Sequence, residues 1–243
     1  MASSKSPMME EVNLNKNSIV DDFMYGSNVA GAHIYIRMGF LRKVYGILST
    51  QLLLTAIVAA IFMMNDSLKE FVHKSPWMML VAFIGTIGVL FALMWKRQET
   101  PTNYILLAVF TVFEAYTVGV VVTMYTVSSV IEAAVLTLGV TVALTLYTLQ
   151  SKRDFSSWGA GLFAFLWILI LAGFLQIIFP SVIMDKMIAI GGATLFSMFI
   201  IFDTHMMMHK LSPEEYILAS VNLYLDILNL FFHILRLVGQ RNN

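Results

Sequence analysis

The stretch VNLYLDILNLFFHILRL, residues 221–237, decides the fold class of this chain. Leu, Ile, Phe and Val supply most of its side chains, so a helix of these residues is apolar enough to lie in a lipid bilayer. Asp226 nevertheless stands in the middle of the stretch, where a carboxylate is costly. Carboxylates within membrane helices face a bundle interior or a cavity and mark ion or proton pathways. The stretch therefore predicts a membrane helix that turns its polar side away from lipid.

The composition of the whole chain also favours a membrane location. Of 243 residues, 58% are hydrophobic and only 12% are charged, and the mean hydropathy is +0.78. Soluble domains carry about 25% charged residues. The charges here cluster between apolar runs of about 20 residues, the length that a helix needs to cross a bilayer. The predicted fold class is an all-α membrane protein, a seven-transmembrane-helix bundle with the spans Val44–Met64, Trp77–Trp95, Tyr104–Met124, Val130–Leu149, Trp158–Phe179, Met187–Met208 and Ile217–Leu237.

The loops between these spans are short, which predicts antiparallel neighbouring helices and leaves no room for a soluble domain. Residues 1–32 lack periodicity and are expected to form a flexible cytosolic tail, ahead of a transmembrane domain over residues 33–243. The tail contains no apolar core, so we expect no cleavable signal peptide.

Orientation follows from the Lys and Arg residues of short loops. Eight lie on one side of the predicted membrane and five on the other, which predicts a cytosolic N-terminus. A re-entrant seventh segment, with both termini in the cytosol, remains an alternative. The two sets are Arg37, Arg42, Lys43, Lys96, Arg97, Lys152, Arg153 and Lys210, against Lys69, Lys74, Lys186, Arg236 and Arg241.

Charge and cysteine content exclude several function classes. The formal net charge is zero, so no basic balance predicts a nucleic-acid partner. The chain has no cysteine, which excludes disulfides, thiol catalysis and Cys-ligated metal sites. We expect no cofactor and no enzymatic activity.

A polar stripe marks one face of the seventh span. Its members recur at intervals of three, four or seven residues and so share one helix face. Since the rest of this helix is apolar, the stripe predicts a central helix lining the bundle interior; an interhelical hydrogen-bond seam without transport is the alternative. The stripe comprises Glu215, Asn222, Asp226, Asn229, His233, Arg236 and Gln240.

Asp203 is the expected partner of Asp226, because a tight turn joins spans six and seven. Counting back from that turn places Asp203 at a depth of about 12 Å and Asp226 at about 20 Å. Two carboxylates in a poorly solvated site are expected to share one proton, and they can exchange it for Ca²⁺, which takes oxygen ligands. Glu114 lies midway along span three, and Glu132 is expected at the membrane interface.

Three further patterns have structural interpretations. SPEE, residues 212–215, predicts an N-cap at Ser212 with Glu215 completing a capping box. His205 and His209 share a helix face and could ligate zinc, but no third ligand is evident. The threonines of span four predict close helix packing in preference to a pore lining; they are Thr137, Thr141, Thr145 and Thr148.

Several long motifs resemble the transmembrane Bax inhibitor motif family. FDTH (202–205) and HKLSPEEYILASVNLYLDILNLFFHILRL (209–237) resemble its C-terminal signature. DDFMYGSNVAGAHIYIRMGFLRKVYGILSTQLLLT (21–55) and LYTLQSKRDFSSWGAGLFA (146–164) are similar to its Golgi anti-apoptotic branch. The resemblance implies seven helices around a central C-terminal helix, pH-dependent passage of Ca²⁺ out of intracellular stores, suppression of cell death and a Golgi location, with the endoplasmic reticulum as a second membrane.

The resemblance also implies residue roles. The family's two-aspartate sensor corresponds to Asp203 and Asp226, which are also the candidate Ca²⁺ ligands. A basic latch at the end of the second helix corresponds to Lys96 or Arg97. Glu114 resembles a feature of eukaryotic members, and together with Asn222, Asn229 and His233 it is a candidate pore residue.

The leading hypothesis is a Ca²⁺-permeable leak channel gated by the protonation of Asp203 and Asp226. The expected partners are the lipid bilayer, Ca²⁺, and apoptosis regulators or store Ca²⁺ channels. The alternatives are a non-conducting adaptor for apoptotic partners, a seven-helix zinc hydrolase that would use His205 and His209, and a heptahelical receptor, which the short loops disfavour. The sequence does not determine the oligomeric state.

Overall fold

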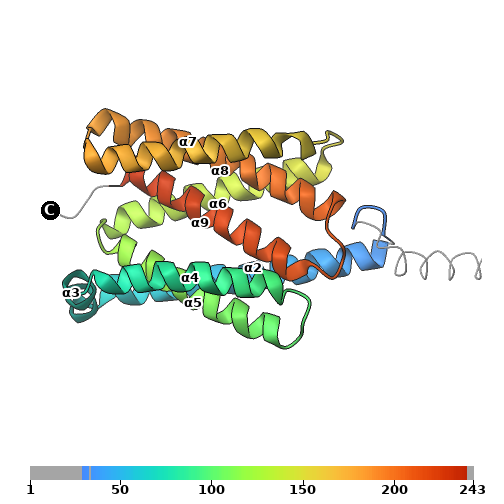
Figure 1. Cartoon of the computed structure of the whole chain (residues 1–243), viewed down its shortest axis with the longest axis horizontal. Helices are drawn as coiled ribbons and strands as arrows, with labels where there is room; N and C mark the ends of the chain where they lie inside the picture. Colours follow the sequence, from blue (N-terminus) through green and yellow to red (C-terminus); the bar gives the residue numbers. More distant parts are fainter. Residues whose placement is uncertain (1–28, 33, 240–243) are drawn as a thin grey trace, which may run out of the picture.

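The computed structural model describes residues 29–32 and 34–239, and it contains seven helices long and apolar enough to cross a membrane (Figure 1). The predicted fold class is confirmed. The helices are α2 (Ile34–Met64), α3 (Asp66–Lys74), α4 (Trp77–Trp95), α5 (Thr102–Val122), α6 (Val127–Gln150), α7 (Gly159–Ile178), α8 (Val182–His209) and α9 (Tyr216–Val238), with a 3-10 turn, η1 (Ser156–Trp158), before α7.

The segment after α2, which the sequence predicts as a loop, contains the short helix α3. Asn65 caps it, because its side chain accepts a hydrogen bond from the Leu68 amide at 3.1 Å. Val72 is buried and Phe71 is exposed, so the helix covers one end of the bundle with a single apolar face. The loop prediction was therefore wrong for residues 66–74.

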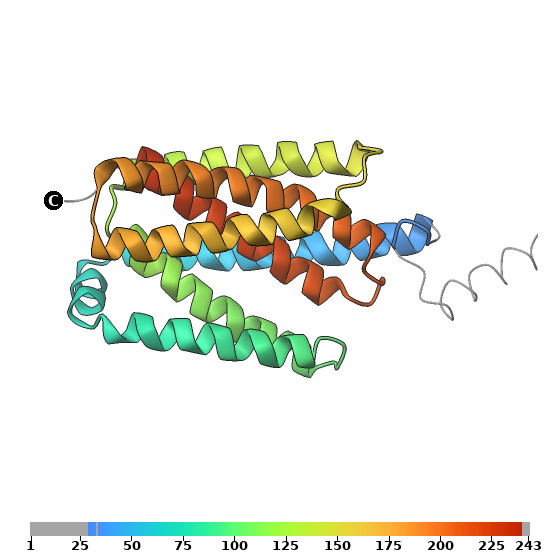
Figure 2. The same ribbon diagram turned by 45° about the horizontal axis from the view of Figure 1, so that its top comes forward.

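Helix α9 lies at the centre of the bundle. It passes diagonally between α6, α7 and α8 on one side and α2, α4 and α5 on the other (Figures 1 and 2). It packs directly against α8, α6, α2 and α5. In its apolar 18-residue stretch, 67% of the residues are buried. The corresponding share is 44% or less in each of the other six spans. The predicted central C-terminal helix is therefore present.

Helix α9 also runs the full length of the bundle. The α4–α5, α6–α7 and α8–α9 connections lie at the end where α2 begins, whereas α9 ends at the opposite end of the bundle, which also holds α3 and the α7–α8 turn (Figure 1). We call the first of these the N-terminal end of the bundle. The seventh segment is thus one continuous helix that extends from one end of the bundle to the other.

The start of α9 differs from the predicted capping box. The helix begins at Tyr216, and Ser212 does not cap it through its side chain. Half of the box is nevertheless formed, because the Ser212 amide donates to Glu215 Oε2 at 3.1 Å. The two residues between them form a turn ahead of the helix, so the helix starts three positions later than the capping box predicts.

The end of the predicted tail is held against the bundle. The Ala30 amide donates to the Met208 carbonyl at 2.7 Å, and the Val29 amide donates to the Leu211 carbonyl at 3.3 Å. Val29 is fully buried. Residues 29–32 are therefore part of the packed structure, and the remainder of the predicted tail, residues 1–28, lies outside the described residues.

Candidate functional site

The structure places the carboxyl groups of Asp203 and Asp226 together, where they interact as a pair. Asp226 is 6% exposed and Asp203 is half-buried. Measured along the helices, Asp203 lies about 9 Å from the end of α8 and Asp226 about 15 Å from the start of α9. The diagonal course of α9 reduces this difference in depth (Figure 2).

The pair has an unsatisfied acceptor. Oδ2 of Asp226 is buried without a hydrogen-bond partner, and no Lys, Arg or His forms an ion pair with either aspartate among residues 29–32 and 34–239. Two adjacent carboxyl groups without a counter-cation are stable only when they share a proton or bind a cation. The chemistry available to the site is therefore proton binding, or exchange of that proton for a hard cation such as Ca²⁺.

Further along the same interface, His233 packs flat on Gly192. A side chain at position 192 would overlap the imidazole ring, so only glycine leaves enough space for it. The ring also stacks on Phe196, with 5.6 Å between ring centroids. Its Nδ1 is buried without a hydrogen-bond partner in the described structure.

At the end of the bundle opposite to the N-terminal end, Arg236 of α9 pairs with Asp185 of α8. Its Nε donates to Asp185 Oδ1 at 2.8 Å, and one of its terminal nitrogens contacts the same oxygen. The sequence analysis did not single out Asp185, although its place in the first turn of α8 favours a negative charge. We use "α8–α9 seam" for the three successive contacts Asp203–Asp226, Gly192–His233 and Asp185–Arg236.

The other stripe residues contribute less. Asn222 and Asn229 are half-buried, and the Asn229 amide donates to the Leu225 carbonyl of its own helix at 2.8 Å. Glu132 is exposed near the start of α6, as expected for an interfacial residue, and Gln240 lies outside the described residues.

Glu114 belongs to a second polar cluster, on the other side of α9. Its carboxyl group lies near the Thr86 hydroxyl of α4 and near Tyr224. The Tyr224 hydroxyl contacts Thr55 Oγ1 of α2 at 2.7 Å. Tyr224 and Asp226 are two residues apart, so their side chains point to nearly opposite sides of the helix. Glu114 is thus separated from the aspartate pair by α9 itself.

Comparison with known proteins agrees with this architecture. A sequence profile described as "Inhibitor of apoptosis-promoting Bax1" matches residues 37–243. The chain belongs to this Bax inhibitor family. It is 52% identical to protein lifeguard 4 of Mus musculus, over 93% of this chain and 95% of the relative. It is 53% identical to the Golgi anti-apoptotic protein of vaccinia virus (strain Lister), over the same shares of both chains.

A more distant relative, Bax inhibitor 1 of Schizosaccharomyces pombe, is 41% identical over 94% of this chain and 86% of its own length. The family resemblance predicted from the C-terminal motifs is therefore confirmed. Each of these relatives matches more than nine-tenths of this chain.

The basic residues proposed as the family's latch do not reach the aspartate pair in this structure. Lys96 pairs with Glu99 at 2.8 Å, and Arg97 pairs with Glu215 at 2.9 Å. The Arg97–Glu215 pair connects the α4–α5 loop to the α8–α9 turn. This partner of Glu215 was not predicted; from the sequence, Glu215 was assigned to the capping box and to the polar stripe.

The two histidines considered as zinc ligands contact each other. The rings of His205 and His209 stack at 4.1 Å between centroids, and His209 Nδ1 donates to the His205 carbonyl at 3.0 Å. His205 Nε2 contacts Asp154 Oδ1 at 3.0 Å. Within the described part of the chain, no group of three His, Asp or Glu side chains could hold a metal ion. The zinc-hydrolase alternative therefore has no ligand set there.

Asp154 lies outside the membrane spans, in the α6–α7 loop. Hydrogen bonds from the side chain and the backbone amide of Ser156, with a smaller contribution from His205, lower the pKa of Asp154 to about 2. The carboxyl group is therefore ionised throughout the physiological pH range.

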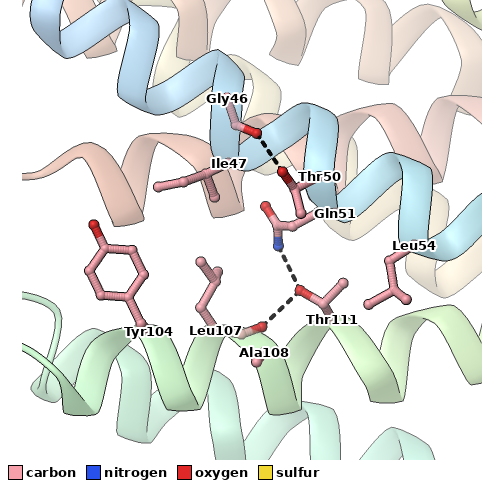
Figure 3. Close-up of a pocket in the computed structure, with 9 residues that line it drawn as sticks. All are labelled: Gly46, Ile47, Thr50, Gln51, Leu54, Tyr104, Leu107, Ala108 and Thr111. Atoms are coloured by element: carbon pink, nitrogen blue, oxygen red, sulfur yellow. Dashed lines mark hydrogen bonds between the residues drawn. The ribbon is translucent and has the colours of Figure 1, made fainter.

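An apolar groove of about 300 Å³ lies between α2 and α5, with Ile47, Leu54, Leu107 and Tyr104 along it (Figure 3). In it the Gln51 amide nitrogen donates to Thr111 Oγ1 at 3.0 Å, because the Thr111 hydroxyl donates its own proton to the Leu107 carbonyl. The groove does not include the aspartate pair, and its apolar walls suit lipid chains better than ions.

Proposed function

We propose that this protein is a Ca²⁺-permeable leak channel of intracellular membranes, and that the Asp203–Asp226 pair makes it sensitive to pH. The observation that carries the proposal is a pair of adjacent carboxyl groups at the centre of a membrane bundle, with one oxygen unpartnered in the described structure. A charged aspartate at this depth costs about 2.5–3.5 kcal/mol on insertion scales. A purely structural role would be served as well by Asn, at lower cost.

The arrangement fits a closed conformation. With one proton shared, the pair holds α8 against α9. Loss of that proton leaves two negative charges that repel each other, separate the helices and attract Ca²⁺. Carboxylate oxygens are suitable ligands for Ca²⁺ as it passes the seam. No enzymatic step is needed for this function.

We extend to this chain a location in the Golgi membrane and a role in restraining apoptosis, because its vaccinia virus relative is named for both. Lowered store Ca²⁺ would link the channel to that role. The alternative is a non-conducting adaptor that acts through apoptotic partners, and it is favoured by the Arg97–Glu215 pair, which fixes the loops of the N-terminal end in one arrangement.

Ca²⁺ flux through liposomes containing the purified protein separates the two functions. Asp226→Asn keeps the side-chain volume but cannot ionise, so it removes one negative charge from the path of a divalent ion. At an effective dielectric constant of about 20, that charge contributes several kcal/mol of attraction for Ca²⁺. Flux should therefore fall at least about tenfold when it is removed. Its pH response should also become flat.

Glu132→Gln is the matched control, because it neutralises an exposed carboxylate near the membrane interface. This variant should conduct as the wild type does. If the wild-type protein supports no flux above empty liposomes, the adaptor function is the correct one. Wild-type flux in Asp226→Asn would show that the pair is not the gate.

A further inference from the structure

A polar cavity of about 240 Å³ lies at the N-terminal end of the bundle, between the α6–α7 loop and the end of α8. It is distinct from the aspartate pair and from the apolar groove. Its walls carry almost only charged and ionisable side chains: Lys152, Arg153, Asp154, His205, His209 and Lys210. A liquid water occupies about 30 Å³, so the cavity has room for a hydrated anion.

The cavity is cationic. Lys152, Arg153 and Lys210 are exposed, and none of the three forms an ion pair with any described residue. The one carboxylate, Asp154, is already occupied by the Ser156 amide at 2.8 Å and by His205. Three cations against one carboxylate leave a net charge of +2 when both histidines are neutral.

The loop that carries these cations is anchored to the bundle. Phe155 is buried, and its ring contacts His205 and Trp158 with centroid distances of 5.6 and 5.0 Å. The Asp154–His205 contact holds the loop to α8 beside it. Lys152 and Arg153 are therefore presented at a defined position next to Lys210, and little ordering is needed before an anion binds.

The cavity also lies where helices long enough to cross a bilayer end, which is the level at which we expect lipid headgroups. It is formed where α6 ends and α8 ends, and the aromatic residues Tyr147 and Trp158 flank it as they flank membrane interfaces. Basic pockets between membrane helices at this level recognise phosphorylated headgroups.

We propose that this cavity binds a phosphomonoester group, such as that of a phosphorylated inositol lipid. A phosphomonoester has nearly two negative charges and three strong acceptor oxygens, which match cations that approach from two chain segments. His209 adds an acceptor, since its Nδ1 donates to the His205 carbonyl and its Nε2 can accept from a protonated oxygen of the phosphate group. A phosphodiester has one charge and fewer free oxygens, so it should bind more weakly.

The test is calorimetric titration of the full-length protein in a neutral maltoside detergent. The probes are dioctanoyl phosphatidylinositol phosphate, dioctanoyl phosphatidylinositol, and soluble inositol phosphate as the headgroup alone. We expect the phosphorylated lipid to bind at least about tenfold more tightly than the unphosphorylated one. Equal affinity of these two lipids would overturn the proposal. Inositol phosphate that binds as tightly as the lipid would support the phosphomonoester site and identify a soluble anion as its ligand.

Some variants should weaken binding of the phosphorylated lipid and one should strengthen it, which separates a binding role of these residues from a structural one. Lys152→Ala and Lys210→Ala should each lower the affinity for the phosphorylated lipid about fivefold. Asp154→Asn retains an acceptor oxygen for Ser156 and His205 but removes a repulsive charge, so it should strengthen binding. Arg42→Ala, an exposed cation on α2 at the same end, should have no effect. Unchanged affinity in both lysine variants, or weaker binding in Asp154→Asn, would contradict the site.

Discussion

Gly192 makes room for the His233 ring at the α8–α9 seam, so Gly192→Ala acts as a wedge between these helices. Adding a methyl group to a well-packed interface costs about 1–3 kcal/mol. Alanine also favours the helix by about 1 kcal/mol, but α8 is helical whether the seam is closed or separated, so this gain cancels between the two states. The closed state is therefore disfavoured by about 1–3 kcal/mol, which is a factor of about 5–150 in the closed-to-open equilibrium.

Ca²⁺ efflux from liposomes at a fixed pH measures that shift directly. Basal flux through Gly192→Ala should rise by about 5–150-fold if few wild-type channels are open. Gly139→Ala is the control, because a methyl group there meets no atom within 4 Å. Replacing His233 by Ala in the Gly192→Ala background should restore low flux. Unchanged or lower flux in the folded single variant would refute the idea that separation of the seam opens the channel.

Asp203→Asn should lower Ca²⁺ flux as far as Asp226→Asn does. Because the two aspartates act as a unit, flux through the double variant should be little lower than through either single variant, and strictly additive losses would contradict this. Wild-type flux should change between about pH 6 and 8, and Asp154→Asn should leave that response intact. Hydrogen bonds hold the pKa of Asp154 at about 2 in the folded protein, whereas the pKa in the unfolded chain is near 4. Ionised Asp154 therefore contributes fully to the stability of the fold above about pH 4, and this contribution is lost only in strong acid. A double-mutant cycle on Arg97 and Glu215, read by thermal unfolding, should give a coupling of about 0.5–1 kcal/mol, and a value of zero would show that the pair is unimportant.

Hydropathy predicted the seven spans because a chain in lipid must satisfy its backbone polar groups internally, and a single helix does so locally. The same rule does not detect α3, which is too short and too polar to cross the membrane. A different sequence pattern indicates this helix. Asn65 is suited to an N-cap, and the apolar residues Leu68, Phe71 and Val72 follow it at helical spacing.

The aspartate pair could be predicted because a tight turn makes α8 and α9 neighbours, whatever the rest of the bundle does. Other contacts of the site could not. The Arg97–Glu215 pair joins two connecting segments, and Glu114 approaches Thr86 between two helices. Both contacts depend on how α4 and α5 pack beside the centre. No local sequence pattern predicts the partners of these side chains. Glu215 was therefore assigned to its own helix, and no partner was predicted for Glu114.

The central position of α9 has a consequence for the biogenesis of the bundle. This helix is the last span to leave the ribosome, so the other six must enter the membrane before the element around which they pack has been made. Until then Asp203 has no carboxyl partner, and the facing surfaces of α2, α6 and α8 can meet only lipid or water. A chain that is truncated after Lys210 and released would therefore leave six helices around an empty centre, with the acidic side chain of Asp203 facing lipid or water.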